Sequence, residues 1–191
     1  MHRLVFTSIV VALAATPVAA PLPEVSGTAR VSGKLQADAV VWLDAASAPL
    51  PATPARAVLD QRNLMFSPHV LAIRVGTTVD LPNNDLVFHN VFSFHDGKKF
   101  DLGLYPVGTS KRLTFDRAGI SRLFCNIHPA MAAYIMAVES PYFAVSDKQG
   151  RFTIRGVPAG THTYRAWRPG GEIVSGTVVA GAGASLEVTW P

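Results

Sequence analysis

Residues 86–94 read Leu-Val-Phe-His-Asn-Val-Phe-Ser-Phe, and this stretch decides the fold class. In an extended strand, alternate side chains point to opposite faces, so Val87, His89 and Val91 share one face. The three phenylalanines share the other face. A strand that is apolar on both faces is expected where other β-layers cover both of its sides. The stretch therefore predicts a β-sandwich in which both faces of this strand are core.

The sequence on both sides of this stretch continues as short β-rich runs separated by turn residues. These runs predict strands at 39–43, 70–75, 77–81, 120–125, 132–138, 151–155, 161–167, 174–179 and 186–190. Residues 100–109 are punctuated by Gly and predict a loop, residues 45–54 predict a linker, and His69 is expected on the surface. No long segment keeps helical periodicity, so the predicted fold class is all-β.

The composition indicates a folded protein without internal disulfides. The chain has 191 residues, of which 49% are hydrophobic, and this is enough for one or two cores. Its single cysteine cannot pair within the chain. The formal net charge is +4, but Lys and Arg form no run, so we expect no nucleic-acid partner.

The N-terminus has the pattern of a secretory signal peptide. A short basic start precedes the apolar run 4–15, which is too short to span a bilayer, and small residues follow. We expect residues 1–20 to be removed by cleavage after Ala20, which places the mature chain in the periplasm or outside the cell. The mature chain is expected to have no membrane span. An uncleaved anchor is the alternative interpretation.

The remaining chain predicts two β-modules, one of which comprises residues 56–139. Residues 150–169, Gly-Arg-Phe-Thr-Ile-Arg-Gly-Val-Pro-Ala-Gly-Thr-His-Thr-Tyr-Arg-Ala-Trp-Arg-Pro, resemble the small carboxypeptidase-regulatory or transthyretin-like β-sandwich. The opening residues resemble the first strands of that module. The resemblance implies a discontinuous module of 24–50 plus 140–191 into which the first is inserted. Two sandwiches in tandem, with 24–50 paired onto the central one, are the alternative.

Potential metal ligands are concentrated in residues 125–131, Cys-Asn-Ile-His-Pro-Ala-Met. Cys125, His128 and Met131 follow one another at three-residue spacing, and His89 lies upstream in the apolar stretch. One thiolate, two imidazoles and one thioether form the ligand set of a blue-copper site. Zinc is disfavoured, because thioethers are not among its structural ligands. The alternative is a buried, inert thiol beside a methionine that only fills the core.

Segments 79–84, 88–91 and 125–131 resemble the cupredoxins, the group of plastocyanin, pseudoazurin and amicyanin, and the short ligand loop is most similar to amicyanin. Residues 100–115 also resemble larger exported cupredoxin-like proteins of the methylamine-utilisation type. The resemblance implies a Greek-key β-sandwich. It implies one copper ion, cycling between Cu(I) and Cu(II), with the ligands His89, Cys125, His128 and Met131. It also implies that Asn90 helps to tie the two ligand loops together.

A filled set of four protein ligands predicts electron transfer rather than catalysis. No open position remains on the metal for a substrate, so we expect a carrier and not an enzyme. Its partners would be a donor and an acceptor redox protein. By resemblance, His128 is the ligand nearest to solvent, and Pro129 and Ala130 form an apolar docking patch beside it. The alternatives are a periplasmic copper carrier and an interaction protein whose second module binds a partner.

Overall fold

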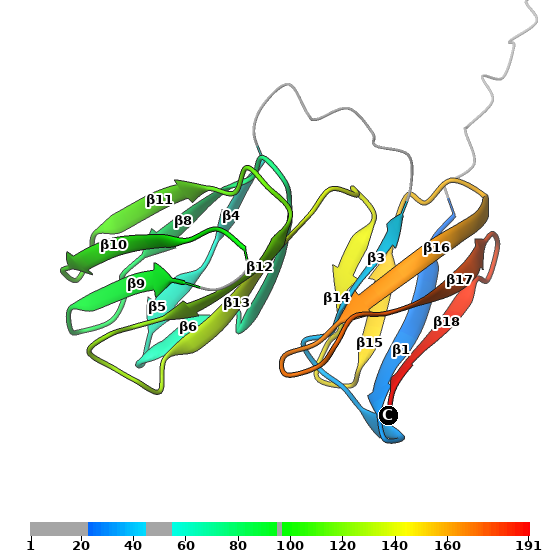
Figure 1. Cartoon of the computed structure of the whole chain (residues 1–191), viewed down its shortest axis with the longest axis horizontal. Coiled ribbons are helices and arrows are strands. Elements are labelled where there is room, and N and C mark those ends of the chain that lie inside the picture. The colour runs from blue at the N-terminus through cyan, green and yellow to red at the C-terminus, as the bar shows by residue number, and fades with distance from the viewer. Residues whose placement is uncertain (1–22, 45–54, 95–96) are drawn as a thin grey trace, which may run out of the picture.

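The computed structural model describes residues 23–44, 55–94 and 97–191, and its named elements in these ranges are all β-strands. The strands form two β-sandwiches that lie side by side (Figure 1). The all-β prediction is therefore confirmed for the described residues. In these same ranges no helix is long and apolar enough to cross a membrane. The predicted signal peptide and the predicted linker at 45–54 lie outside them.

One sandwich, here called the terminal sandwich, consists of two four-stranded sheets. The first has the order β15–β1–β18, with β2 paired to β1, and the second has the order β14–β3–β16–β17. The bounds are β1 (Val25–Val31), β2 (Lys34–Leu35), β3 (Val40–Asp44), β14 (Phe143–Val145), β15 (Arg151–Ile154), β16 (Gly160–Trp167), β17 (Val174–Ala180) and β18 (Ser185–Trp190). Because β1 pairs with both β15 and β18, strands from the two ends of the described chain share one sheet.

The other sandwich, here called the central sandwich, contains residues 86–94. A five-stranded sheet of order β10–β9–β12–β13–β7 faces a three-stranded sheet of order β11–β8–β4, beside the hairpin β5–β6. The bounds are β4 (Arg56–Val58), β5 (Asp60–Arg62), β6 (Met65–Ser67), β7 (Val70–Arg74), β8 (Thr78–Pro82), β9 (His89–Ser93), β10 (Phe100–Tyr105), β11 (Ser110–Thr114), β12 (Gly119–Phe124) and β13 (Ala132–Val138). Leu81, Val91 and Leu123 are fully buried in its core.

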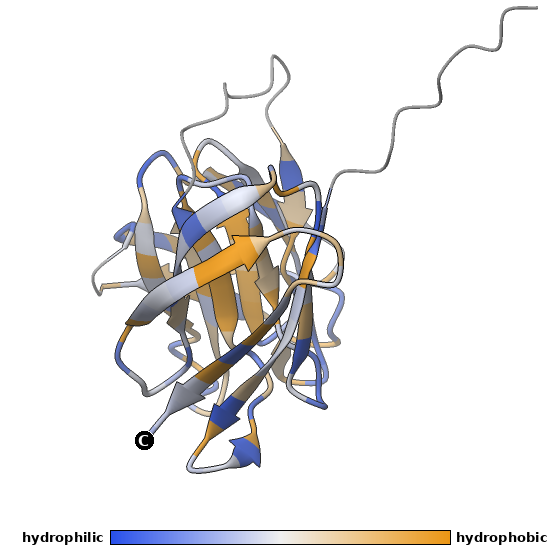
Figure 2. Cartoon of the chain, turned by 90° about the vertical axis from the view of Figure 1, so that its right-hand side faces the viewer, coloured by the Kyte–Doolittle hydropathy of each residue, from blue (hydrophilic) through white to orange (hydrophobic). Residues whose placement is uncertain are grey.

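The two sandwiches share a third apolar cluster. Trp42 and Trp167 of the terminal sandwich pack with Val70, Met136 and Val138 on the outer face of β7 and β13. Figure 2 shows apolar residues along the strands of the molecule and hydrophilic residues in many of its turns. Burial of two tryptophans makes this contact a packed interface rather than a loose one.

Polar and edge-on aromatic contacts extend the same interface. The ring of Tyr134 meets that of Trp167 edge-on, with ring centres 5.2 Å apart. Asp38 of the terminal sandwich lies 2.8 Å from the imidazole Nδ1 of His69. The sequence places His69 on the surface, and the structure adds that this half-exposed ring joins the two sandwiches.

The strand at the centre of the sequence argument is shorter than predicted. It begins at His89, and residues 86–88 form a loop in which Leu86 is 90% exposed and Phe88 is 55% exposed. The cause is local, because the buried side chain of Asn83 donates a hydrogen bond to the carbonyl of Val87 and holds the loop away from the sheet. Phe94 is also 61% exposed, so the prediction that both faces are core is wrong at these positions.

Residues 100–109 are not entirely a loop, as the sequence analysis expects. Residues 100–105 form β10, which pairs antiparallel with β9 and is interrupted by a shift of register between Asp101 and Leu104. Gly103 has a φ of +66° at this irregularity, a conformation that glycine adopts without steric cost. The glycine read as a loop signal therefore marks a bulge within a strand.

Candidate metal centre

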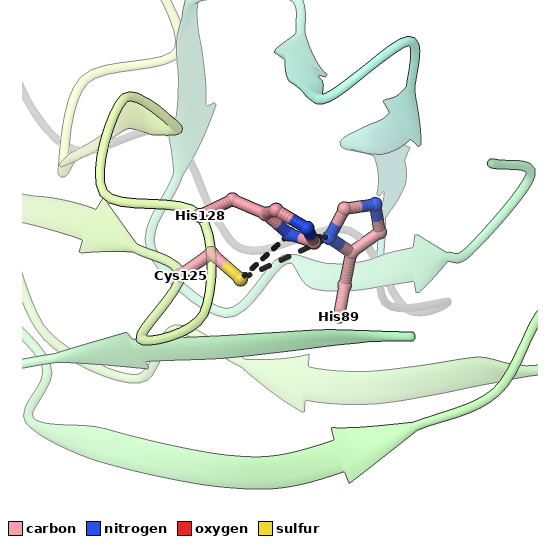
Figure 3. A group of neighbouring side chains, drawn as sticks. All are labelled: His89, Cys125 and His128. Carbon is pink, nitrogen blue, oxygen red and sulfur yellow. Dashed lines mark hydrogen bonds between the residues drawn. The ribbon is translucent and has the colours of Figure 1, made fainter. Parts of the chain in front are cut away.

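Three potential ligand side chains converge at one end of the central sandwich (Figure 3). His89 begins β9, Cys125 directly follows β12, and His128 lies in the loop before β13. The Nδ1 atoms of the two imidazoles are 3.1 Å apart. The sulfur of Cys125 lies 3.8 Å from Nδ1 of His89 and 3.7 Å from Nδ1 of His128. The structure thus brings together three residues that the sequence keeps in two separate segments.

These distances fit a single metal ion. Metal–nitrogen bonds of about 2.0 Å and a metal–sulfur bond of about 2.3 Å in one trigonal plane place the nitrogens about 3.5 Å apart, and each about 3.7 Å from the sulfur. The observed triangle of 3.1, 3.7 and 3.8 Å is close to that arrangement. Two imidazoles and one thiolate are the donors that a trigonal copper site uses. The residues present therefore fit a copper ion.

The loop that carries two of these donors is closed by a tight turn. The backbone N–H of Met131 donates to the carbonyl of His128 at 2.9 Å, with Pro129 and Ala130 between them. Proline suits this position because its fixed φ matches the second residue of a turn. Pro129 and Ala130 are exposed and His128 is partly exposed. The predicted docking residues thus lie on the surface next to the least buried of the three donors.

Met131 occupies the core rather than the surface. It is 1% exposed and belongs to the same buried cluster as Cys125. The turn described above fixes its backbone only three residues from His128. Its place in the same buried cluster as Cys125 is compatible with a weak thioether donor, and the ligand role of Met131 stays a prediction.

One carboxylate that the sequence analysis does not single out supports His89. The Nε2 atom of His89, which is fully buried, lies 3.0 Å from a carboxylate oxygen of Asp85. A carboxylate accepts a hydrogen bond, so Nε2 carries the proton and Nδ1 presents its lone pair to Cys125 and His128. The signal in the sequence is the spacing, since Asp85 precedes His89 by four residues.

Asp85 is held as an anion by its surroundings. A hydrogen bond from the backbone N–H of Leu64 is the largest cause, and together with the ring of His89 and the N–H of Leu86 it lowers the pKa of Asp85 to about 2. These bonds outweigh burial, which acts in the opposite direction. The ionised carboxylate is therefore the form that meets His89 over the ordinary range of pH.

Two further buried polar residues fix the loop that leads to the site. Asn83 donates to the carbonyls of Val87 and Tyr105, and its side-chain oxygen accepts the N–H of Asp85. The hydroxyl of Tyr105 donates to the carbonyl of Leu81 and is also contacted by Gln61. Burial raises the pKa of Tyr105 to about 12, so this hydroxyl stays protonated as a donor.

The side chain of Asn90 makes a different contact from the one the resemblance suggests. Its amide donates to the carboxylate of Asp101 on β10 at 2.7 Å. This bond ties β9 to its neighbour in the sheet and does not reach the loop that holds His128. The role of Asn90 between the two ligand loops stays a prediction.

Comparisons with known proteins place cupredoxins among the structural neighbours of the chain. A purple cupredoxin from Nitrosopumilus maritimus is 26% identical and matches 43% of this chain and 99% of its own, with a TM-score of 0.40. Amicyanin from Paracoccus versutus is 23% identical and matches 51% of this chain and 97% of its own, with a TM-score of 0.39.

A third neighbour is much longer than the matched region. The Cu-containing nitrite reductase (NirK) from Thermus scotoductus SA-01 is 27% identical and matches 50% of this chain, with a TM-score of 0.42, but only 25% of its own length is covered. No protein-family model matches the chain. A search of curated proteins also finds no match.

Proposed function

We propose that this chain is an exported type 1 copper protein that carries single electrons between two redox proteins. The observation that carries the proposal is the convergence of two Nδ1 atoms and one sulfur within 4.8 Å of one another. The export signal in residues 1–20 and a location in the periplasm belong to the same proposal. A soft sulfur with two imidazoles is the donor set that suits copper in both of its common oxidation states.

Each residue has a separate task in this proposal. His89, Cys125 and His128 would hold the ion, and Met131 would act as a weak fourth ligand. A bound copper ion supplies one-electron chemistry by alternating between Cu(I) and Cu(II). The protein contributes a site that is mostly shielded from water, since Cys125 and Met131 are almost fully buried and His89 is completely so. Asp85 orients the ring of His89, which limits the movement of ligands when the charge changes.

Partner docking is proposed at the surface around His128. Pro129 and Ala130 are exposed there, and Ile127 in the same loop is 43% exposed. A few exposed apolar residues in one loop suit a brief encounter between redox proteins, which uses a small interface. His128 is the ligand through which electrons would pass, because the other three donors lie beneath it.

A protein that delivers copper would use the same donors, but the burial of three of these four donors favours electron transfer. A protein that hands over its metal needs ligands that another protein can replace one after another. Here only His128 is partly exposed. We therefore expect a strong chelator to remove copper slowly from the folded protein. Complete removal within the mixing time would favour delivery.

The decisive experiment is the absorption and electron paramagnetic resonance spectrum of the purified protein with Cu(II). An intense visible band from the thiolate–copper bond, with narrow copper hyperfine splitting, is expected. The variant Cys125→Ser should bind copper without the band, and Lys148→Ser, on the terminal sandwich, is the control that should keep it. A colourless wild-type protein that has taken up Cu(II) would contradict the proposal.

A further inference from the structure

The terminal sandwich covers only part of the outer face of the five-stranded sheet. The terminal sandwich packs against β7 and β13 through Trp42 and Trp167. Beyond that contact, β9, the residue that follows it and β12 present a surface that we call the aromatic–arginine face. It consists of Phe92, Phe94, Arg122 and Phe124. Phe94 is 61% exposed, and Phe92 and Phe124 are partly exposed, so this region is not core.

The aromatic rings of this face form a connected group. The ring centres of Phe92 and Phe94 are 4.9 Å apart, and those of Phe92 and Phe124 are 5.8 Å apart. The guanidinium carbon of Arg122 lies 4.7 Å from the ring centre of Phe124 and 5.8 Å from that of Tyr134. Because Tyr134 in turn contacts Trp167, the face continues directly into the interface between the sandwiches.

The guanidinium group of Arg122 contacts aromatic rings. Among residues 23–44, 55–94 and 97–191, no carboxylate forms an ion pair with it. A guanidinium that is stacked on an aromatic ring keeps its N–H groups at the edge, where they fit the two oxygens of a carboxylate. Asp101, which lies two strands away on β10, is engaged by Asn90 and Gly103.

A second group of charged residues lies next to β12. The N–H of Gly97 donates to the carbonyl of Ile120, two residues before Arg122. The adjoining surface carries Lys98, Lys99 and Arg117 around Asp116. Lys98 is paired with Asp116 at 2.8 Å, whereas Lys99 and Arg117 form no ion pair among the described residues. Exposed apolar surface with a positive rim is typical of a site that binds an acidic protein partner.

We propose that the aromatic–arginine face binds an acidic protein segment that places a carboxylate on Arg122 and apolar or aromatic side chains on Phe92 and Phe94. This surface lies on the opposite side of the sheet from the core that contains Cys125. It is distinct from the docking residues beside His128. The inference does not require copper, so it can fail without affecting the proposed electron transfer, and the reverse also holds.

The first test uses the full chain without copper and the paramagnetic anion hexacyanochromate(III) as the probe. Line broadening of amide signals is expected at Phe92, Phe94 and Phe124, and it should disappear in Arg122→Glu. The matched control is Lys111→Glu, which changes an exposed cation on β11 and should leave this broadening intact. Broadening that survives Arg122→Glu, or that is no stronger here than around Lys111, would overturn the proposal.

The second test uses an acidic peptide composed of Glu and Tyr. Because Arg122→Glu removes a charge-assisted hydrogen bond and introduces repulsion between like charges, it should weaken binding about tenfold or more. Phe94→Ser should also weaken it, whereas Lys111→Glu should not. Equal binding by wild type and Phe94→Ser would show that charge alone acts and would overturn the aromatic half of the proposal.

Further binding experiments would identify two other possible partners of this face. Tighter binding of a single-stranded oligonucleotide than of the acidic peptide, lost in Arg122→Glu, would replace the protein partner by a nucleic acid. A concentration-dependent dimer in analytical ultracentrifugation, lost in the same variant, would identify a second copy of the chain as the occupant. Either result would overturn the proposal as stated.

Discussion

One carboxylate oxygen of Asp85 lies 3.0 Å from the ring nitrogen of His89 and 2.7 Å from the backbone N–H of Leu64. Leu64 is at the tip of the hairpin β5–β6, where it is exposed. A buried donor and a surface hairpin therefore share a single acceptor atom. We therefore expect a displacement of the hairpin tip to change the orientation of His89 through this atom.

Replacing Asp85 tests this relationship. Asp85→Ala removes both hydrogen bonds and should lower copper affinity about 10- to 100-fold, as loss of a partner to a ligating histidine does. Asp85→Asn keeps an acceptor oxygen and should lower it less. In Asp85→Ala, hydrogen exchange at the Leu64 amide should also become faster. The control is Asp101→Ala, which removes the carboxylate on β10 that Asn90 contacts. An equal loss of copper affinity in this variant would refute the role of Asp85 as the partner of His89.

The different exposure of the two histidines makes a second prediction. His128 is partly exposed, so His128→Gly leaves a gap that imidazole in solution can reach. His89 is fully buried, so His89→Gly leaves a gap that imidazole cannot enter. Added imidazole should restore the visible copper band in the first variant and not in the second. Rescue of both variants would show that the cavity is open from both sides.

Met131 can be tested with little disturbance of the core. Leucine has a similar volume, so Met131→Leu should change the free energy of unfolding by less than about 1.5 kcal/mol. If the thioether is the weak axial ligand, this variant keeps the visible band but has a different reduction potential. Voltammetry and chemical denaturation measure the two effects. An unchanged potential would assign Met131 to packing alone.

The interface between the sandwiches predicts coupled unfolding. Trp167→Ala should lower the free energy of unfolding by about 3–5 kcal/mol, the usual cost of removing a large buried aromatic side chain. It should also separate the thermal transition into two steps, because the shared cluster loses its largest bridge. Trp190→Ala, in the core of the terminal sandwich alone, is the control. Two resolved transitions in the wild type would contradict this prediction.

Asp80 gives the stability a defined dependence on pH. Its hydrogen bonds to Arg56 and then to Arg112 lower its pKa below the ordinary value of 3.8. A lowered pKa means that the stabilisation is complete above the unfolded value and is lost as pH falls through the folded one. The melting temperatures of wild type and Asp80→Asn should therefore differ at neutral pH and converge in acid. A constant difference at every pH would refute the ionic origin.

The sequence by itself was sufficient for the local features of the site. The loop from Cys125 to Met131 brings its donors together by chain connectivity, because a turn with proline has few alternatives. The all-β class also follows from alternating apolar runs and turn residues, which are local properties. The sequence also placed His89 in a strand, as observed, and its role as a metal ligand stays a prediction.

Only the tertiary structure decided which distant segments meet. Asp85 lies beside Leu64 because a hairpin folds onto the loop, and no local periodicity encodes that contact. Phe94 looks like core in the sequence, yet it is exposed because the terminal sandwich covers β7 and β13 instead. Alternation tells which side of a strand a residue faces. What covers that side depends on packing between parts of the chain that are far apart, and those contacts are settled by the whole fold.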